Sequence, residues 1–257
     1  MALLLKNVCK TFEDTNTTIL NNINFEMESG EFLCVVGRSG CGKSTLLNLI
    51  AGLERLTSGE ITLNGKKIDG PGADRAVMFQ ENALYPWLNV MGNVKFGMEI
   101  AGVSKEEQEE RALKYLRMMQ MEEYKDYAIH QLSGGMRQRV ALARAFTLDF
   151  EMILMDEPFS ALDKKTSGRL REELQSMWME TKKTVFFITH SVEEAVYLGT
   201  RVAIMSEKEK TVREIIPIEL ERPRREDDEA FISYKQQILE AIESEGAEQD
   251  DRGIEKK

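Results

Sequence analysis

The sequence predicts an α/β fold with a helical segment inserted in it, and three observations carry this prediction. The first third of the 257 residues consists of short apolar or alternating runs typical of strands. Residues 90–148 have helical patterns, and the last third returns to alternating strands and helices. Alternation of this kind is typical of a sheet covered by helices. Residues 1–220 are therefore expected to form one domain, with an inserted helical lobe at about residues 90–148.

The individual elements follow from local patterns. Runs bounded by turn residues predict strands at 2–12, 19–27, 31–36, 59–64 and 75–80. In the helical part, Ser104 can cap a helix over residues 104–119, because Glu107 follows three residues later as in a capping box. The last third predicts strands at 152–155, 184–189, 202–205 and 212–216, and helices at 164–180 and 192–198.

The end of the chain, residues 221–257, differs in composition from the rest. It holds twelve Asp or Glu residues, with apolar residues at helical spacing among them, namely Phe231, Tyr234, Ile238, Leu239 and Ile242. This pattern predicts an amphipathic helix followed by a disordered tail after Gly246. The extension is expected to be an inert solubiliser, while a contact to a second copy of the chain or a regulatory role would fit the same composition.

Composition and charge argue against several classes of protein. The net charge of −10, from 34 basic and 44 acidic residues, disfavours a nucleic-acid binder, which usually has a basic face. No apolar run reaches the roughly 18 residues that a membrane span needs, and the apolar start at residues 1–6 is too short for a signal peptide. Cys9, Cys34 and Cys41 lack metal-ligand or disulfide spacing. A cytosolic protein is expected.

The most informative stretch is Gly37-Arg38-Ser39-Gly40-Cys41-Gly42-Lys43-Ser44, which fits G-x-x-x-x-G-K-[ST]. It lies between a predicted strand and a predicted helix that continues through Thr45, which is the context a phosphate-binding loop requires. Glycines let the backbone aim N–H groups at phosphate oxygens, and the helix N-terminus adds positive potential. Lys43 is expected to reach the terminal phosphates, and the Ser44 hydroxyl to bind Mg²⁺.

Two carboxylates, Asp156 and Glu157, directly follow the apolar run at 152–155. Acids at the end of a strand fit the edge of a parallel sheet at which α/β proteins bind ligands. Beside a phosphate loop, Asp156 would hold Mg²⁺ and Glu157 would polarise the attacking water. Taken without the loop, these acids could simply end a strand; together the two signals favour nucleotide hydrolysis.

A second glycine-bearing segment, Ser133-Gly134-Gly135, opens a predicted helix, with Ser133 as its N-cap. A helix start of this kind can bind an anion. Because no Lys-Ser pair of its own follows, the segment suggests a site for a nucleotide held by a different copy of the chain. An ordinary capped helix is the alternative for Ser-Gly-Gly taken alone.

The ordered set of these motifs resembles the nucleotide-binding subunit of an ATP-binding cassette (ABC) transporter. The set also includes Gln80, Leu132, residues 160–163 and residues 188–190, so the resemblance covers about residues 3–216. It implies a P-loop NTPase fold: a RecA-like core with an antiparallel β subdomain and an inserted α-helical subdomain. It further implies ATP and Mg²⁺ as cofactors and a head-to-tail homodimer that buries two ATP molecules.

The resemblance also implies roles for single residues. Glu157 would act as the general base, His190 would contact the γ-phosphate, and Lys43 would neutralise phosphate charge. A lone histidine after a strand is otherwise more often structural. The implied magnesium ligands are Ser44, Gln80 and Asp156.

Nucleotide contacts outside the loop are implied in the same way. Phe12 resembles the aromatic residue that stacks on adenine, although it could equally be a core residue of its strand. Asp163 resembles the residue that crosses the dimer interface. The signature segment departs from the commonest form of the family at Met136, where Gln is usual. Methionine cannot donate a hydrogen bond, so no ribose contact is assigned to it.

The segment after Gln80, residues 81–94, contains Tyr85-Pro86-Trp87-Leu88. In the family this is where a membrane permease docks, and this form is similar to importers of nitrate, aliphatic sulfonates and taurine. The resemblance therefore implies an importer ATPase at the cytoplasmic face of the membrane, bound to separate permease subunits and served by a solute-binding protein. The alternatives are a non-transport nucleotide switch and, for residues 81–94, a simple lobe-linking loop with Trp87 in the core.

Overall fold

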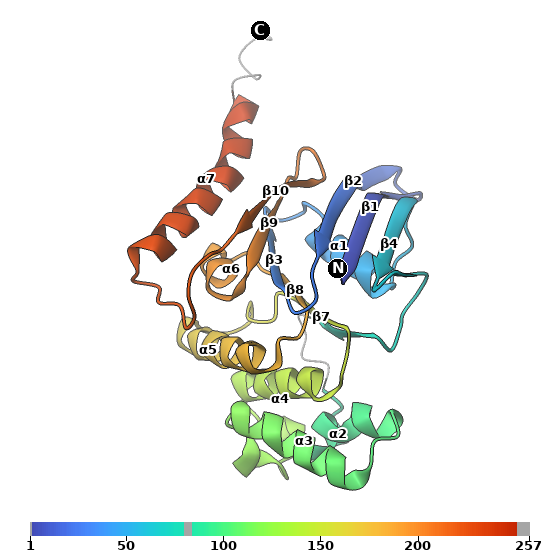
Figure 1. Ribbon diagram of the computed structural model, residues 1–257, viewed down its shortest axis with the longest axis vertical. Coiled ribbons are helices and arrows are strands. Elements are labelled where there is room, and N and C mark those ends of the chain that lie inside the picture. The colour runs from blue at the N-terminus through green and yellow to red at the C-terminus, as the bar shows by residue number, and fades with distance from the viewer. Residues whose placement is uncertain (1, 80–83, 251–257) are drawn as a thin grey trace. The chain divides into compact units, whose positions relative to one another are not determined.

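The computed structural model describes residues 2–79 and 84–250, and it divides into two compact units. The first unit consists of Met1–Gly72 and Lys183–Lys257, and the second is Ala73–Lys182. Figure 1 shows the elements of each unit. Mixed strands and helices of this kind confirm the predicted α/β class. Gln80, which has a predicted role, lies outside the described residues.

An antiparallel sheet in the first unit has the strand order β2-β1-β4-β5. Its strands are β1 (Leu3–Phe12), β2 (Thr17–Met27), β4 (Ser58–Leu63) and β5 (Lys66–Lys67). Leu3 pairs with Met27 on one side and with Leu63 on the other, and these three side chains are buried. The β4–β5 turn at Asn64 and Gly65 has positive φ at both residues, as tight hairpins require. The two-residue β5 was not expected.

A second group of strands in the same unit has the order β10-β9-β3-β8. β3 (Phe32–Gly37) is parallel to β8 (Val185–Ile188) and β9 (Arg201–Met205), while β10 (Val212–Pro217) is antiparallel to β9. β8 is buried along its whole length, and β3 is buried except at its last residue, as is typical of parallel strands covered on both faces.

Helices α1 (Lys43–Ala51), α6 (Val192–Leu198) and α7 (Glu229–Asp250) also belong to the first unit (Figure 1). α1 packs on β3 and β8, and α6 packs on β3. α7 packs on α6 and β9, burying Phe231 and Ile238. This helix continues past Gly246, where the sequence predicts an end, because Ala, Glu and Gln around that glycine favour helix.

The described part of the second unit contains two parallel strands and four α-helices. β6 (Arg75–Met78) pairs with β7 (Met152–Asp156), with Met78 opposite Met155. Helices α2 (Val90–Ile100), α3 (Lys105–Met118) and α4 (Gly134–Thr147) pack on one another, and α5 (Lys164–Thr181) contacts α4. Short 3₁₀ turns occupy Glu122–Tyr124 and Ile129–Gln131. Ser104 caps α3, where its hydroxyl oxygen accepts a hydrogen bond from the Glu107 N–H at 3.2 Å, as expected.

Across the described part of the chain, none of the helices combines the length and apolar character needed to cross a lipid bilayer.

Candidate nucleotide site

The predicted phosphate loop connects β3 to α1. Gly42 is the N-cap of α1 with φ of 98°, a left-handed conformation that glycine adopts without strain. At Gly37 a Cβ atom would lie 2.6 Å from the Met205 carbonyl oxygen, so a larger residue would force β3 and β9 apart. Both glycines are therefore required by the backbone path, independently of any ligand.

Lys43 lies at the start of α1, and its side chain folds back over the loop. Its Nζ donates hydrogen bonds to the carbonyl oxygens of Gly37 at 2.9 Å and Arg38 at 3.0 Å, and lies 3.8 Å from the Cys41 Sγ. Only 7% of Lys43 is exposed. The ammonium is thus held by the loop itself, while the neighbouring Ser44 is exposed.

Phe12 ends β1 and is half-buried. The Lys10 ammonium lies 4.6 Å from the centre of its ring and also forms an ion pair with Glu54 at 3.0 Å. A cation over an aromatic face is a favourable contact. One face of the ring is therefore occupied within the chain, and adenine stacking by Phe12 stays a prediction.

Asp156 is the last residue of β7, and Glu157 follows it in a left-handed conformation with φ of 46°. A non-glycine residue in this region is uncommon, and such conformations gather at functional sites. The Glu157 carbonyl accepts hydrogen bonds from the Ser160 N–H at 3.2 Å and Oγ at 3.0 Å, which hold the turn. Both acidic side chains are half-buried.

The signature serine, Ser133, is the N-cap of α4, and its Oγ accepts a hydrogen bond from the Met136 N–H at 3.3 Å. Gly134 and Gly135 form the first turn. A Cβ on Gly135 would lie 2.7 Å from the Thr166 Cγ2 of α5, whereas a Cβ on Gly134 would meet nothing closer than 4.0 Å. The two glycines therefore differ: packing requires Gly135, and Gly134 leaves the helix start open.

Asp163 caps α5 in the same unit. Its Oδ1 accepts hydrogen bonds from the N–H groups of Lys165 at 3.1 Å and Thr166 at 3.0 Å, and its Oδ2 accepts one from the Thr166 hydroxyl at 2.7 Å. The Thr166 bonds lower the pKa of Asp163. Because Thr166 also contacts the Gly135 position, the structure brings the predicted interface residue and the signature segment together.

His190 is exposed and follows the buried Thr189 at the end of β8. The Thr189 hydroxyl donates to the Glu194 Oε2 at 2.6 Å and accepts from the Ser191 N–H at 3.0 Å. Both bonds join Thr189, which precedes His190, to residues that follow it. These roles of Thr189 and Glu194 were not predicted, although hydroxyl residues on both sides of a histidine, with an acid three residues after the second hydroxyl, could have suggested them.

The aromatic segment that follows the undescribed residues is organised by Asn93. This side chain is fully buried; its Oδ1 accepts from the Tyr85 N–H at 2.7 Å, and its Nδ2 donates to three carbonyls of the segment, the shortest bond being 3.0 Å to Asn89. Trp87 is 72% exposed, so it does not belong to the core. No pattern in the sequence predicted this role of Asn93.

A cavity of about 210 Å³ lies beside this segment, lined mainly by apolar residues and by Tyr85 and Arg144. The Arg144 guanidinium lies 5.2 Å from the centre of the Tyr85 ring, which also packs on Phe96. Burial lowers the pKa of Arg144.

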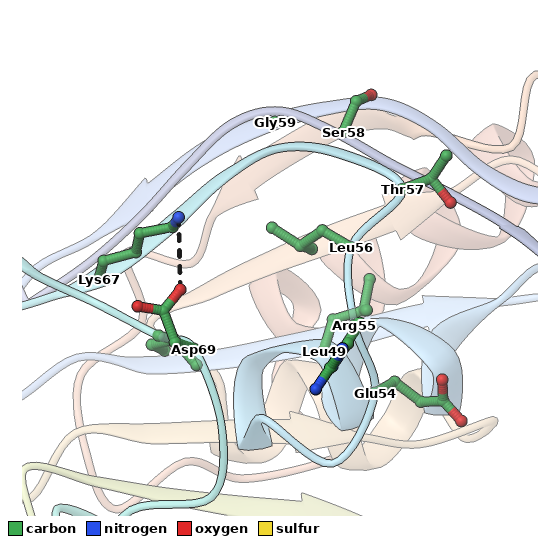
Figure 2. Close-up of a pocket in the computed structure, with 10 residues that line it drawn as sticks. Leu49, Glu54, Arg55, Leu56, Thr57, Ser58, Gly59, Lys67 and Asp69 are labelled. Atoms are coloured by element: carbon green, nitrogen blue, oxygen red, sulfur yellow. Dashed lines mark ion pairs between the residues drawn. The ribbon is translucent and has the colours of Figure 1, made fainter.

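The first unit has a larger pocket of about 370 Å³, shown in Figure 2. Its lining includes Glu54, Arg55 and an ion pair between Lys67 and Asp69 at 3.3 Å. Among the residues that the structure describes as lining it, none has a predicted nucleotide role. The predicted site is therefore a loop surface at a helix start and not this pocket.

The predicted Mg²⁺ fits the chemistry of these residues. Ser44 and Asp156 offer hydroxyl and carboxylate oxygens, the ligands that Mg²⁺ prefers when substrate phosphates complete its shell. Within residues 2–79 and 84–250, side chains of His, Cys, Asp and Glu do not gather in a group of three that could hold a metal ion by themselves.

A lysine held over a glycine loop at the start of a helix is the arrangement with which P-loop proteins bind nucleotide phosphates. The chain also has a strand, β7, that ends in an acid and is followed by a second one, and these two features define the class of protein as a P-loop nucleotide-binding protein.

Comparisons with known proteins narrow this class. The family model described as ABC transporter matches residues 20–160. An uncharacterized ABC transporter ATP-binding protein of Methanocaldococcus jannaschii is 48% identical, covering 95% of this chain and 92% of the relative. A taurine import ATP-binding protein of Pseudomonas putida is 41% identical, covering 95% and 97%. A dimeric ATP-binding cassette bound to ADP and Pi matches with a TM-score of 0.72 and 32% identity, covering 85% of this chain and 100% of that one.

The chain belongs to the ABC transporter family. It is an ATP-binding, ATP-hydrolysing subunit related to importer ATPases, and its P-loop NTPase fold is confirmed.

Proposed function

We propose that two copies of this chain form a head-to-tail dimer, in which ATP binding and hydrolysis drive solute import through a separate membrane permease. The observation that carries the proposal is the contrast between two helix starts. One bears a lysine over a phosphate loop, and the other, at Ser133, has glycines but is followed by no lysine-serine pair. A helix start without its own phosphate-binding lysine fits a role that completes the nucleotide site of another copy.

Each predicted residue then has a defined task. The N–H groups of the loop and the Lys43 ammonium bind the phosphates, and Ser44, Asp156 and Gln80 hold the metal ion. When bound, Mg²⁺ would neutralise negative charge on the phosphates. Glu157 accepts a proton from the attacking water, and His190 orients the γ-phosphate. The partner copy contributes Ser133, Gly134 and Asp163.

The left-handed turn at Glu157 supports its role as the base. Bonds from Ser160 to the Glu157 carbonyl hold this residue in a conformation that costs about 1–3 kcal/mol for a side-chain-bearing residue. Such a conformation persists only where the surrounding structure enforces it. A backbone held in this way fixes the point from which the carboxylate extends, and an in-line attack by water needs an oriented base, because orientation supplies much of the catalysis.

The segment at Tyr85–Trp87 supports a permease as the partner. An exposed tryptophan near a cavity of about 210 Å³ offers an anchor point for a short helix of another protein. We propose that the permease docks here, which would place the chain at the cytoplasmic face of the membrane. The motif resemblance and the taurine import relative support an importer of the nitrate, sulfonate and taurine type.

The proposed chemistry is tested with Glu157→Gln. We expect phosphate release with Mg²⁺ and ATP to fall by at least roughly a hundredfold, because a general base contributes on the order of 10²–10⁴ in rate. Labelled ATP should still bind, and the variant should elute as an ATP-trapped dimer in size-exclusion chromatography. Wild-type turnover in this variant would contradict the assignment.

A further inference from the structure

Helix α6 is attached to the predicted γ-phosphate contact, because it begins directly after His190 and its N-cap Ser191. It has only seven residues, Val192–Leu198. Helices this short are marginal by themselves, so their position is set by what packs on them. The contacts of α6 therefore decide where the backbone of His190 lies.

The first turn of α6 fixes the histidine locally. The Ser191 Oγ accepts from the Glu194 N–H at 3.3 Å, and the Glu194 carboxylate accepts from the Thr189 hydroxyl at 2.6 Å. Thr189 is 1% exposed. Residues 189–194 thus form a closed set of hydrogen bonds, and the loop that carries His190 must move together with α6.

The far end of α6 is held by two arginines from the segment that precedes α7. The Arg224 Nη1 donates to the carbonyls of Val196 and Gly199, both at 2.6 Å, and the Arg222 Nη2 donates to the Leu198 carbonyl at 2.5 Å. Helix ends leave such carbonyls without intrahelical partners, and cations are favoured at this end of the helix dipole. Arg224 is only 5% exposed, so this cap is built into the core.

Arg224 also forms a hydrogen bond within its own segment of the chain, because its Nη2 donates to the Ile218 carbonyl at 3.1 Å. Burial, with the neighbouring charge of Arg222 as a smaller cause, lowers the pKa of Arg224 to about 9. The guanidinium therefore remains protonated near neutral pH and keeps its donors.

Helix α7 holds the opposite end of α6. The Lys235 ammonium lies 3.2 Å from the Glu193 Oε2 in the first turn of α6, and α7 buries Phe231 and Ile238. Figure 1 shows α7 beside α6. The C-terminal segment thus holds both ends of a helix that carries a predicted catalytic histidine. An inert solvated extension would not need a buried guanidinium group, that of Arg224, placed on that helix.

We propose that Arg222, Arg224 and Lys235 form a C-terminal clamp whose function is to position His190 through α6 during ATP hydrolysis. The inference rests on the proposed function, in which His190 contacts the γ-phosphate. The clamp residues are positioning residues and not catalytic ones. Because Lys43 and the glycine loop lie on a different helix, loss of the clamp should slow turnover and leave ATP binding intact.

The test compares Lys235→Gln with Gln237→Glu, an exposed position on the same helix, because both changes lower the net charge by one. We expect Lys235→Gln to reduce kcat roughly two- to fivefold, the range of a partly exposed ion pair, with the Kd for ATP unchanged. Gln237→Glu should keep wild-type kcat. The charge exchange Glu193→Lys with Lys235→Glu should restore kcat to within about twofold of wild type.

Arg224→Met tests the buried cap, and we expect a loss of roughly tenfold or more in kcat with an unchanged Kd for ATP. All rates are measured well below the melting temperature of each variant, since a merely structural clamp would lower Tm and leave the kcat of the folded protein unchanged. If Arg224→Met does not fold, the proposal is tested by Lys235→Gln, its control Gln237→Glu and the charge exchange alone.

The proposal is overturned if Lys235→Gln keeps wild-type kcat and Arg224→Met, provided that it folds, keeps it too. A parallel His190→Ala variant separates this failure from failure of the proposed function. Full turnover in His190→Ala would refute the catalytic role of His190 and with it the proposed function of this residue. Slow turnover in His190→Ala, with wild-type rates in the clamp variants, would refute the clamp alone.

Discussion

The starts of α1 and α4 are both glycine-bearing, yet they are built differently. At α1 the N-cap is Gly42, the described structure shows no capping side chain there, and Lys43 lies over the loop. At α4 the Ser133 hydroxyl accepts from the Met136 N–H, so one of the free donors of the helix is already bonded. The proposed function accordingly assigns phosphate binding to the first helix start and completion of the partner's site to the second.

Among the changes that test the difference between the two helix starts, replacement of Lys43 should have the largest effect. Lys43→Met removes the ammonium that the loop holds and should lower turnover at least roughly a hundredfold, with weaker MgATP binding. Arg137→Met, which removes the same charge at the start of α4, should leave ATP affinity of the monomer unchanged. Both affinities can be measured by titration with a fluorescent ATP analogue. Equal losses of ATP affinity in Lys43→Met and Arg137→Met would contradict the different roles assigned to the two helix starts.

The second helix start is tested with Ser133→Arg. An arginine at this exposed N-cap should block the partner's nucleotide from docking, because its bulk and length fill the helix start. We expect no ATP-dependent dimer and a loss of turnover of roughly a hundredfold, with monomer affinity for labelled ATP retained. Sedimentation velocity with and without ATP decides this, and a dimer of normal stability would argue against the assigned role of Ser133.

The glycines give a smaller and purely structural contrast. An alanine at Gly42 would place Cβ 2.8 Å from the Leu20 Cδ2 in a left-handed conformation, whereas an alanine Cβ at Gly134 would meet nothing closer than 4.0 Å. Gly42→Ala should cost about 1–3 kcal/mol and lower Tm by several degrees. Gly134→Ala should leave Tm unchanged or raise it slightly, since alanine is the better helix former. Thermal unfolding by circular dichroism without nucleotide tests both, and similar decreases in Tm would contradict the difference.

The smallest expected effect concerns Gly135 and Thr166. Gly135→Ala should lower Tm by a few degrees, because its Cβ would lie 2.7 Å from the Thr166 methyl. Thr166→Ser removes that methyl and keeps the hydroxyl that donates to Asp163. The double variant should recover the lost stability, as a coupled pair does. A purely additive double variant would show that the contact is not the cause.

Local motifs made the main elements predictable, and distant partners account for what was missed. The phosphate loop, the strand ending at Asp156 and the cap at Ser133 are each encoded within about ten residues, so their placement followed from the sequence. Asn93 was missed because its value lies in the backbone groups that it binds, and no residue pattern marks those. Arg224 was missed because the carbonyls that it caps lie 25 and 28 positions earlier.

The two-residue β5 and the exact end of α7 were beyond reach for a different reason. A strand of two residues, Lys66–Lys67, has no periodicity from which to infer it, and it forms because the Asn64–Gly65 turn folds it back onto β4. Helix ends are likewise set by weak preferences. The sequence therefore predicts the elements that carry chemistry better than those that only finish a sheet or a helix.

The central claim is that two copies jointly enclose each ATP, and the specific ATPase rate measured over a dilution series tests it most directly. Sedimentation at the same concentrations, with MgATP present, would report the fraction of dimer. The account predicts that phosphate release per chain falls in proportion to the dimer as the protein is diluted. A rate per chain that stays at its maximum in a fully monomeric sample would contradict it.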